Sequence, residues 1–539
     1  MITLQGKSVY EAIAIAPLHL LKHTNTSVEK VQVSDVNSEL EAFHVAQNLA
    51  MRQLDELYHK ALETVGEESA AIFEIHKMML EDMDYVESIE RIIQAEKCNA
   101  VYAVFQTGES FAEIFASMDD EYMQGRAADV KDISKRLIAC LSGAGKDTNC
   151  AEGKYILLTD DLAPSETMQM DKKRVAGFVT CAGSANSHTA ILARTLGIPA
   201  VVNTGELVGD ECEGKLVIID GHNGLVYIEP TSDLLEKYSA QLRSEVAERT
   251  ALNQLKGELS VTKNGQHVNV YANIGNTADL DKVFENDAEG IGLFRSEFIY
   301  LESDDYPTEE KQFAIYKQVA EALGKKKVII RTLDIGADKQ AAYFNLPEED
   351  NPALGYRAIR ICLTRKELFK TQLRAICRAS AYGKLAIMFP MIISTQEITE
   401  CKNTLAEVMQ ELKAENIAFD ENIEIGIMVE TPAAALMTME LGKIVDFFSI
   451  GTNDLTQYTL AIDRQNQSLE KFFDAHHPAV LKLIEMTVQN AHANNIWAGI
   501  CGELGADLSL TEAFVAMGID ELSVAPSSVL PLRAKIRSL

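Results

Sequence analysis

The sequence predicts an α/β multidomain protein that ends in an eight-stranded (β/α)8 TIM-like barrel. Three observations predict this class: a length of 539 residues, a change from helical to strand-rich patterning near residue 155, and eight apolar segments that alternate with helical stretches after residue 265. A chain of this length is too long to fold around a single ordinary hydrophobic core. We therefore expect about three units at roughly 150 residues each, or fewer if one is a large barrel.

The N-terminal part is predicted to be mainly helical. Residues 1–32 indicate one short strand, around 12–15, followed by a loop. From Val33 onward, apolar residues recur at steps of three and four, which is typical of amphipathic helices. We expect four helices with short connections in a subdomain over 33–143, inserted into another domain. Their centres are residues 40–57, 70–82, 100–115 and 127–141.

In the middle of the chain, the helical pattern gives way to a strand-rich pattern. Short runs rich in β-branched residues, bounded by Gly, Asp and Asn, predict an α/β domain over 144–230, which residues 1–32 complete. A charged helical pattern then covers 231–256. We predict a linker helix there, followed by a C-terminal domain over 257–539.

That C-terminal domain is predicted to be the barrel. Eight mostly apolar strands, separated by helical stretches over about 275 residues, match the strand number and the length of a (β/α)8 barrel. A doubly wound open sheet remains the structural alternative. The predicted strands are 267–274, 290–295, 327–334, 385–391, 424–430, 446–452, 496–503 and 521–526.

Composition narrows the possible functions. The formal net charge is −30, which repels nucleic acid and anionic membranes, so a bound anion needs a local cluster of Arg or Lys. No apolar run approaches the ~20 residues of a membrane span, and the N-terminus lacks the organisation of a cleavable signal. Nine scattered cysteines without a C-x-x-C pair argue against disulfides or zinc. We expect a cytoplasmic enzyme.

Polar residues fall at the ends of the predicted barrel strands, where barrel enzymes place their chemistry. One such residue is more often a cap or turn residue, but the same placement on six of eight strands favours a site. The set comprises Asn273, Arg295, Arg331, Asp334, Glu430, Asn453, Asp454, Arg464 in the loop beyond, Cys501 and Glu503.

The chemistry of this set indicates a small, highly anionic substrate. Its three arginines are permanently charged planar donors suited to phosphate and carboxylate. Glu430 and Asp454 offer two hard oxygens, too few to enclose calcium but suited to Mg²⁺, which keeps waters and takes substrate oxygens. Cys501 is either a packing residue or a proton donor.

A second candidate site lies in the middle domain. Small residues over 183–187 form a loop, and an apolar helical pattern then runs to Gly197. His188 is thus predicted in the first turn of a helix, where backbone N–H groups favour an anion. A neutral imidazole is a competent nucleophile toward phosphorus. The alternative is that Ser187 caps the helix and His188 is exposed without a role.

The motifs together resemble enzyme I of the bacterial phosphotransferase system, the phosphoenolpyruvate–protein phosphotransferase family, over essentially the whole chain. Because the motifs occur in the same order and at the same separations as in this family, together they are specific for it. They are SHTAILAR (187–194), GLFRSEFIY (292–300), RTLDIGADK (331–339), NPALGYRAIRI (351–361), FPMI (389–392), GIMVETPAAA (426–435), SIGTNDLTQY (449–458) and CGELGAD (501–507).

The resemblance implies a role for each site residue. His188 would be the phosphorylated histidine and Cys501 would protonate the enolate carbon. Arg295 and Arg331 would grip the phosphate of phosphoenolpyruvate. Further residues would contact the substrate or Mg²⁺: Asn453 and Arg464 would orient the substrate, Glu430 and Asp454 would bind Mg²⁺, and Asp454 would also face the substrate.

The resemblance also implies partners and motion. The helical subdomain would dock the carrier protein HPr, the α/β domain would carry His188 between HPr and the barrel, and the chain would form a homodimer through the barrel and serve sugar uptake. One departure concerns the loop before His188, where Ser184, Ala185 and Asn186 replace the usual Gly, Arg and Thr. This departure affects the expected contacts between loop and phosphate.

Two other functions stay open at this point. A pyruvate–phosphate dikinase or phosphoenolpyruvate synthase shares the phosphohistidine and barrel domains, but it requires an ATP-binding domain, and the first 150 residues are predicted to be helices without one. A regulatory protein that senses phosphoenolpyruvate without turnover is suggested by the altered loop at 184–186. Retention of every barrel ligand argues against it.

Overall fold

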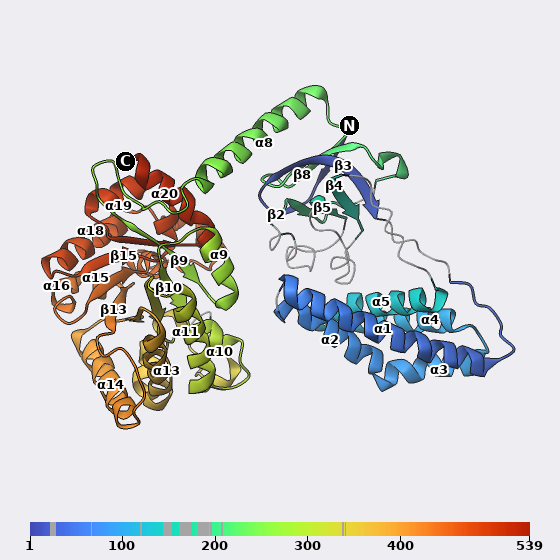
Figure 1. Ribbon diagram of the computed structural model, residues 1–539, viewed down its shortest axis with the longest axis horizontal. Coiled ribbons are helices and arrows are strands. Elements are labelled where there is room, and N and C mark those ends of the chain that lie inside the picture. Colours follow the sequence, from blue (N-terminus) through green and yellow to red (C-terminus); the bar gives the residue numbers. More distant parts are fainter. Residues whose placement is uncertain are drawn as a thin grey trace. The chain divides into compact units, whose positions relative to one another are not determined.

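The computed structural model describes residues 1–21, 28–65, 67–118, 121–143, 153–160, 174–181, 193, 197–205, 208–336, 339 and 341–539. The chain divides into two compact units, Met1–Ala247 and Glu248–Leu539. The N-terminal unit contains a helical bundle and a β-sheet, and the C-terminal unit is a barrel (Figure 1).

Five helices form the bundle, so the prediction of four was wrong. They are α1 (Val36–Val65), α2 (Glu67–Glu81), α3 (Met83–Glu96), α4 (Ala100–Ala116) and α5 (Glu121–Ser142). The missed helix is α3. It begins immediately after α2 because the Asp82 side chain caps it, accepting the Tyr85 N–H at 3.1 Å. Its buried residues Tyr85, Ile89 and Ile93 recur at four-residue steps, the signal that marks an amphipathic helix.

The same unit contains an eight-stranded mixed sheet, in the order β1-β8-β7-β3-β4-β5-β6-β2. Its strands are β1 (Ile2–Gln5), β2 (Lys7–Tyr10), β3 (Ile13–Leu21), β4 (Tyr155–Thr159), β5 (Val175–Thr180), β6 (Ala200–Val202), β7 (Leu216–Asp220) and β8 (Leu225–Ile228). The prediction of one strand in residues 1–32 was therefore wrong. The two missed strands lie at the sheet edges and have only four residues each, too few for alternation to mark a strand.

Helix α8 (Ser232–Asn253) follows the sheet, where a linker helix was predicted. Within the N-terminal unit it is attached near its start, because Tyr238 is buried and its hydroxyl donates to Asp220 Oδ2 at 2.7 Å. Among the described residues, no helix combines the length and apolar character needed to span a bilayer.

The C-terminal unit is a closed barrel of eight parallel strands, which confirms the predicted barrel and excludes the open-sheet alternative. Each predicted segment contains one strand. They are β9 (Asn269–Ile274), β10 (Ile291–Arg295), β11 (Val328–Arg331), β12 (Leu385–Phe389), β13 (Glu424–Val429), β14 (Phe447–Ile450), β15 (Trp497–Ile500) and β16 (Glu521–Val524).

Helices surround this barrel. The longer ones are α11 (Glu309–Leu323), α13 (Lys366–Ala379), α14 (Thr395–Ala414), α17 (Thr452–Leu460), α18 (Pro478–Ala493) and α20 (Val529–Ser538). The shorter ones are α9 (Leu280–Glu285), α10 (Glu297–Leu301), α12 (Ile359–Thr364), α15 (Pro432–Leu436), α16 (Thr438–Leu441) and α19 (Thr511–Met517).

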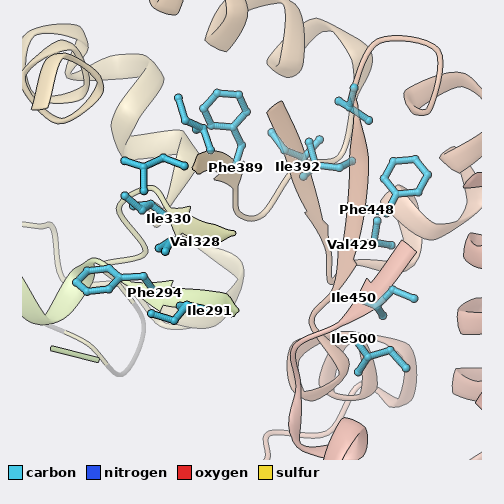
Figure 2. Packing of buried hydrophobic residues seen from close by; sticks show 14 of the residues in the cluster. Ile291, Phe294, Val328, Ile330, Phe389, Ile392, Val429, Phe448, Ile450 and Ile500 are labelled. Atoms are coloured by element: carbon cyan, nitrogen blue, oxygen red, sulfur yellow. The ribbon is translucent and has the colours of Figure 1, made fainter. Parts of the chain in front are cut away.

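Alternation along the strands separates two apolar layers. Side chains such as Phe294, Phe389 and Phe448 belong to the large core between strands and helices (Figure 2). Their neighbours in the sequence, including Met388 and Phe447, form a separate cluster with Cys501. Because successive residues of a strand face opposite sides, this second cluster fills the barrel interior.

A buried arginine ties the end of the chain to the base of the barrel. Arg533 on α20 is fully buried and donates to Asp287 Oδ2 at 2.7 Å and to the Leu255 carbonyl at 3.0 Å. We predict that Arg533→Met lowers the free energy of unfolding of the barrel by about 3 kcal/mol, because it removes the charged donor that the Asp287 carboxylate and the Leu255 carbonyl share. Urea unfolding measures the loss, and Arg537→Met, at an exposed ion pair, is expected to cost less than about 1 kcal/mol.

Candidate active site

One cavity of about 180 Å³ lies at the C-terminal ends of the barrel strands. Its lining includes every barrel residue to which the resemblance assigns a role: Arg295, Arg331, Glu430, Asn453, Asp454, Arg464 and Cys501. The fold explains why these residues lie together. Arg295 and Arg331 end β10 and β11, while Glu430 and Cys501 directly follow β13 and β15, and parallel strands of a barrel bring these ends to one rim.

The second predicted site cannot be placed in the same way. His188 lies outside the described residues, as do Ser184, Ala185, Asn186 and Ser187. Its role therefore stays a prediction from the sequence.

A buried charge network forms one wall of the cavity. Arg331 contacts Glu297 and lies 3.0 Å from Asp334 Oδ2 through its Nη2 atom. Burial alone would lower the pKa of the Arg331 guanidinium, but Asp334 and Glu297 raise it above the ordinary value. Burial would raise the pKa of Asp334, but neighbouring cations, Arg331 first, hold it well below its ordinary value. Both side chains therefore stay charged.

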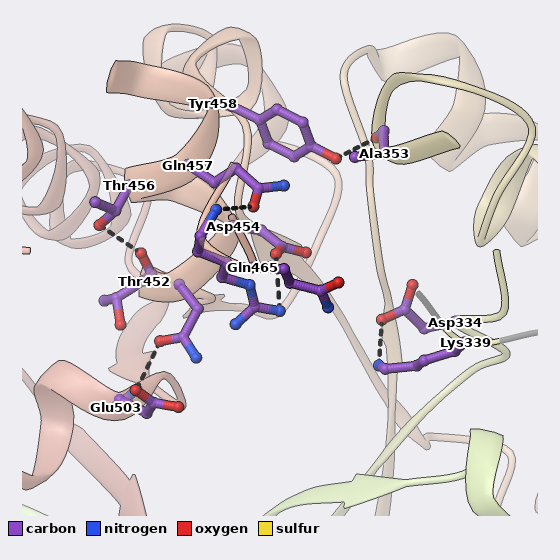
Figure 3. A network of polar contacts seen from close by, with 12 residues as sticks. Asp334, Lys339, Ala353, Thr452, Asp454, Thr456, Gln457, Tyr458, Gln465 and Glu503 are labelled. Atoms are coloured by element: carbon purple, nitrogen blue, oxygen red, sulfur yellow. Dashed lines mark hydrogen bonds and ion pairs between the residues drawn. The ribbon is translucent and has the colours of Figure 1, made fainter. Parts of the chain in front are cut away.

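Two cations of this wall were missed in the sequence. Arg357, only 4% exposed, lies 2.9 Å from Asp334 and 3.4 Å from Asp454. Lys339 Nζ lies 3.2 Å from Asp334 Oδ2 (Figure 3) and 2.7 Å from Glu297 Oε1. Both lie in the long segment between β11 and α12 rather than at a strand end. The charged residues inside RTLDIGADK and NPALGYRAIRI were the signal that could have found them.

The remaining two cations differ in how they are held. Arg464 Nη2 lies 3.4 Å from Asp454 Oδ1, and its side chain is about one-third exposed. Arg295 is partly buried and, within the described part of the chain, has no hydrogen-bond or ion-pair partner. A guanidinium without a carboxylate partner in a polar cavity is suited to bind an anion.

Two asparagines of the rim hold backbone in place. Asn453 Oδ1 accepts the Glu503 N–H at 3.0 Å, which fixes the segment after β15 beside the cavity. Asn273 donates to the carbonyl groups of Cys501 at 3.0 Å and Ser523 at 3.1 Å. Asn273 therefore supports the rim, and only Asn453 lines the cavity.

Two carboxylates face the cavity in conditions that favour a cation. Glu430 is buried, and its Oε1 accepts the Met391 N–H at 2.5 Å. Burial, then the charges of Asp454 and Asp334, raise the pKa of Glu430 to about 8. A Cβ at Gly451 would come within 3.0 Å of Glu430 Oε2, so the glycine keeps space beside this oxygen. A cation between the carboxylates would relieve their repulsion.

The donor set fits Mg²⁺ in particular. Across the described ranges, no group of three or more His, Cys, Asp or Glu side chains is arranged to hold a metal. Two carboxylates alone suit Mg²⁺, which commonly takes one or two protein oxygens and completes its shell with water and substrate phosphate. Glu430 and Asp454 are the residues that would hold it.

Cys501 places a buried thiol at the cavity. Its side chain is 3% exposed, it packs in the apolar barrel interior, and its Sγ lies 3.7 Å from the Ile450 carbonyl. Burial raises the pKa of the Cys501 thiol to about 12. The thiol therefore carries its proton throughout the neutral range, as a proton donor to a carbon must.

Comparisons with known proteins agree over the whole chain. Three family models match: PEP-utilising enzyme, N-terminal (residues 5–126), its mobile domain (151–224) and its PEP-binding domain (249–539). The phosphoenolpyruvate-protein phosphotransferases of Bacillus sp. (strain S) and Geobacillus stearothermophilus are each 42% identical over 538 residues, covering 100% of this chain and 93% of theirs. A solution structure of an Enzyme I (nEIt) protein is 34% identical, covers 45% of this chain and 99% of that chain, and has a TM-score of 0.39.

Proposed function

Because the chain belongs to the phosphoenolpyruvate-protein phosphotransferases, the enzyme I family, we propose that it transfers the phosphoryl group of phosphoenolpyruvate to His188 and onward to a histidine of the carrier protein HPr. The single observation that carries the barrel part of this proposal is the cavity in which four arginines, the carboxylates of Glu430 and Asp454, and the protonated thiol of Cys501 meet.

The cavity binds substrate mainly by charge and position. Phosphoenolpyruvate carries a phosphate and a carboxylate on three carbons, and Arg295, Arg331 and Arg464 offer planar donors to these groups. The Asp334 carboxylate holds Arg331 and Arg357 in fixed positions. Phosphoryl transfer needs positioning and charge stabilisation more than covalent help from the protein, and preorganised guanidinium groups provide both.

Departure of the phosphoryl group leaves the enolate of pyruvate. In our proposal Cys501 gives its proton to C3 of the enolate, which forms the methyl group and makes the transfer favourable. The high pKa of the thiol keeps this proton in place until a carbanion-like acceptor arrives.

Mg²⁺ is the proposed cofactor, and Glu430 and Asp454 would hold it. When bound, it neutralises oxygens of the substrate. We predict that Glu430→Gln lowers the apparent Mg²⁺ affinity by about 100-fold without unfolding the barrel, because burial already favours a protonated, neutral Glu430 in the absence of metal. Phosphorylation measured against Mg²⁺ concentration tests this.

The control for this variant is Glu440→Gln, which removes an exposed carboxylate of α16. It should titrate like wild type. Chelation by EDTA should stop phosphorylation of wild type and added Mg²⁺ should restore it. An unchanged Mg²⁺ titration in Glu430→Gln would contradict the assignment.

The other parts of the chain have proposed roles in transport of the phosphoryl group. The α/β domain of residues 1–32 and 144–230 would carry His188, the segment 231–256 would link it to the barrel over 257–539, and the helical subdomain over 33–143 would dock HPr. We also propose a cytoplasmic homodimer, associated through the barrel, that serves sugar uptake.

Helix α2 and the start of α3 offer an apolar docking surface for HPr. The side chains of Met78 and Met83 are 69% and 72% exposed, and Met78 borders a groove of about 320 Å³ that also includes Phe73, Glu74 and Glu81. Exposed methionines adapt to a partner surface, and the acidic rim would favour a basic one.

We predict that Met78→Asp slows phosphoryl transfer to HPr by about tenfold and leaves phosphorylation by phosphoenolpyruvate unchanged, because one desolvated contact of this kind costs about 1 to 2 kcal/mol. Quenched-flow measurement of both steps separates them. Val45→Asp, at an exposed position of α1, is the matched control. Equal transfer rates in both variants would contradict this docking surface.

The function is tested by mixing the chain with phosphoenolpyruvate, Mg²⁺ and HPr in the absence of ATP. We expect pyruvate and phospho-HPr in equal amounts. Transfer of the phosphoryl group to an adenine nucleotide, with formation of ATP, would favour a dikinase. Binding of phosphoenolpyruvate without pyruvate formation would favour a regulatory protein.

A further inference from the structure

The barrel interior contains a carboxyl group that the proposed mechanism does not use. Glu521, the first residue of β16, is 1% exposed, and neither of its carboxyl oxygens has a hydrogen-bond partner in the described part of the chain. Its strand neighbour Leu522 belongs to the outer core, so alternation directs Glu521 into the barrel. Buried polar groups are normally paired, so this one requires an explanation.

The surrounding strands leave room for this carboxyl group. A Cβ added at Gly292 of β10 or at Gly499 of β15 would overlap one of the two Glu521 carboxyl oxygens. The neighbouring strand β15, and β10 beyond β9, therefore lack side chains at the level of the carboxyl group, so the barrel has room for it.

Glu521 lies on the same interior path as Cys501. Gly499 pairs with Glu521 in the sheet register. Cys501, which directly follows β15, comes two residues after Gly499, so it faces the same side about 7 Å further along. Further polar groups lie between the level of the Glu521 carboxyl group and that of Cys501. Ser523, two residues after Glu521, donates to Asn273 Oδ1 at 2.6 Å, and Asn273 donates to the Cys501 carbonyl at 3.0 Å.

Burial favours the neutral form of the Glu521 carboxyl group. Burial raises the pKa of Glu521 well above its ordinary value, Lys327 acts in the opposite direction, and Asp520 adds to the rise. Lys327 pairs with Glu424 at 2.5 Å and lies 4.8 Å from the centre of the Trp497 ring. A neutral carboxyl group in the interior is a store of one proton close to Cys501.

We propose that Glu521 returns a proton to Cys501 through the barrel interior after Cys501 has protonated the product. This inference rests on the proposed function. Cys501 faces the cavity on one side and packs against the apolar cluster of the barrel interior on the other. A pyruvate bound in the cavity would cover the thiol, so the interior is the route that remains for a proton while product is present. Glu521 does not touch the substrate.

The proton balance is as follows. The S–H bond of Cys501 breaks as the C–H bond at C3 forms, which leaves a thiolate. The O–H bond of Glu521 then breaks and the S–H bond forms again, with the proton passing over the Ser523 hydroxyl or a water molecule. The Glu521 carboxylate finally takes a proton from water at the base of the barrel. No oxidant or further reactant is needed.

Glu521→Gln tests the proposal, because glutamine keeps the shape but cannot supply the proton. At neutral pH an unfolded Glu521 is ionised and must gain a proton on folding, so this substitution should raise the melting temperature, increasingly as the pH rises above 4.5. The variant should therefore fold. Pyruvate formation is followed by stopped flow with excess phosphoenolpyruvate, Mg²⁺ and HPr.

We expect a first turnover of one pyruvate per chain at the wild-type rate, because Cys501 starts protonated, followed by a steady phase about 100-fold slower than that of wild type. Thiolate absorbance in the ultraviolet should accumulate during the slow phase. Asp520→Asn, which removes the neighbouring carboxylate paired with His492, is the matched control and should show wild-type rates in both phases.

Two results would overturn the proposal: a variant with both phases at wild-type rates, or one in which both phases slow equally, as a structural role requires. If the glutamine variant does not fold, Glu521→Asp keeps a displaced carboxyl group and should slow the steady phase alone by about tenfold. A wild-type chain that forms no pyruvate at all would instead refute the proposed function.

Discussion

Replacing Arg295 by alanine is expected to lower kcat/KM for phosphoenolpyruvate by about 100- to 1,000-fold, the loss typical of one preorganised donor to a developing charge. Arg295 has no hydrogen-bond or ion-pair partner in the described part of the chain, so its removal leaves no buried charge unpaired. The melting temperature should therefore stay at the wild-type value. Steady-state kinetics and thermal unfolding of the same preparation measure both quantities.

Arg331→Ala provides the contrast. Arg331 is buried against Glu297 and Asp334, so its loss should reduce activity and also destabilise the barrel by about 3 to 5 kcal/mol. The pair of variants separates a binding role from a structural one. Wild-type kcat/KM in Arg295→Ala would contradict the assignment of this residue to the substrate.

Replacing Cys501 by alanine is expected to slow pyruvate formation by about 1,000-fold, within the range that a positioned acid contributes. The KM for phosphoenolpyruvate should change little, because the thiol acts on the enolate and not on the bound substrate. Since the pKa of Cys501 is about 12, the wild-type rate should show no loss from ionisation of this thiol between pH 6 and 9.

The control is Cys377→Ala, the same substitution at a buried cysteine of α13 that packs in the outer core. It should retain wild-type pyruvate formation, with at most a loss of stability. Comparable slowing in both variants, or full activity in Cys501→Ala, would show that Cys501 is not the proton donor.

The barrel and its rim were predictable because both follow from local patterns. The strands alternate with helical stretches, and a parallel barrel necessarily collects residues such as Glu430 and Cys501 at one end. Motif resemblance then assigned their roles, and the cavity shows that these residues do meet.

Other parts of the fold and of the site could not be predicted, because they depend on contacts between residues far apart in the sequence. Arg357 and Lys339 reach the site from a long loop, so their pairing with Asp334 depends on how that loop closes. The edge strand β1 is made by hydrogen bonding to β8 rather than by its own apolar pattern. Glu521 is the first residue of the barrel strand β16, and the sequence alone does not indicate a functional residue at the start of a barrel strand.

The central claim is that the phosphoryl group of phosphoenolpyruvate reaches His188. Its most direct measurement is the incubation of the purified chain with phosphoenolpyruvate labelled at phosphorus and Mg²⁺, without ATP, followed by mapping of the label. The account predicts one acid-labile phosphate per chain, located on His188 and absent from His188→Ala. An unlabelled wild-type chain, or label on another residue, would contradict it.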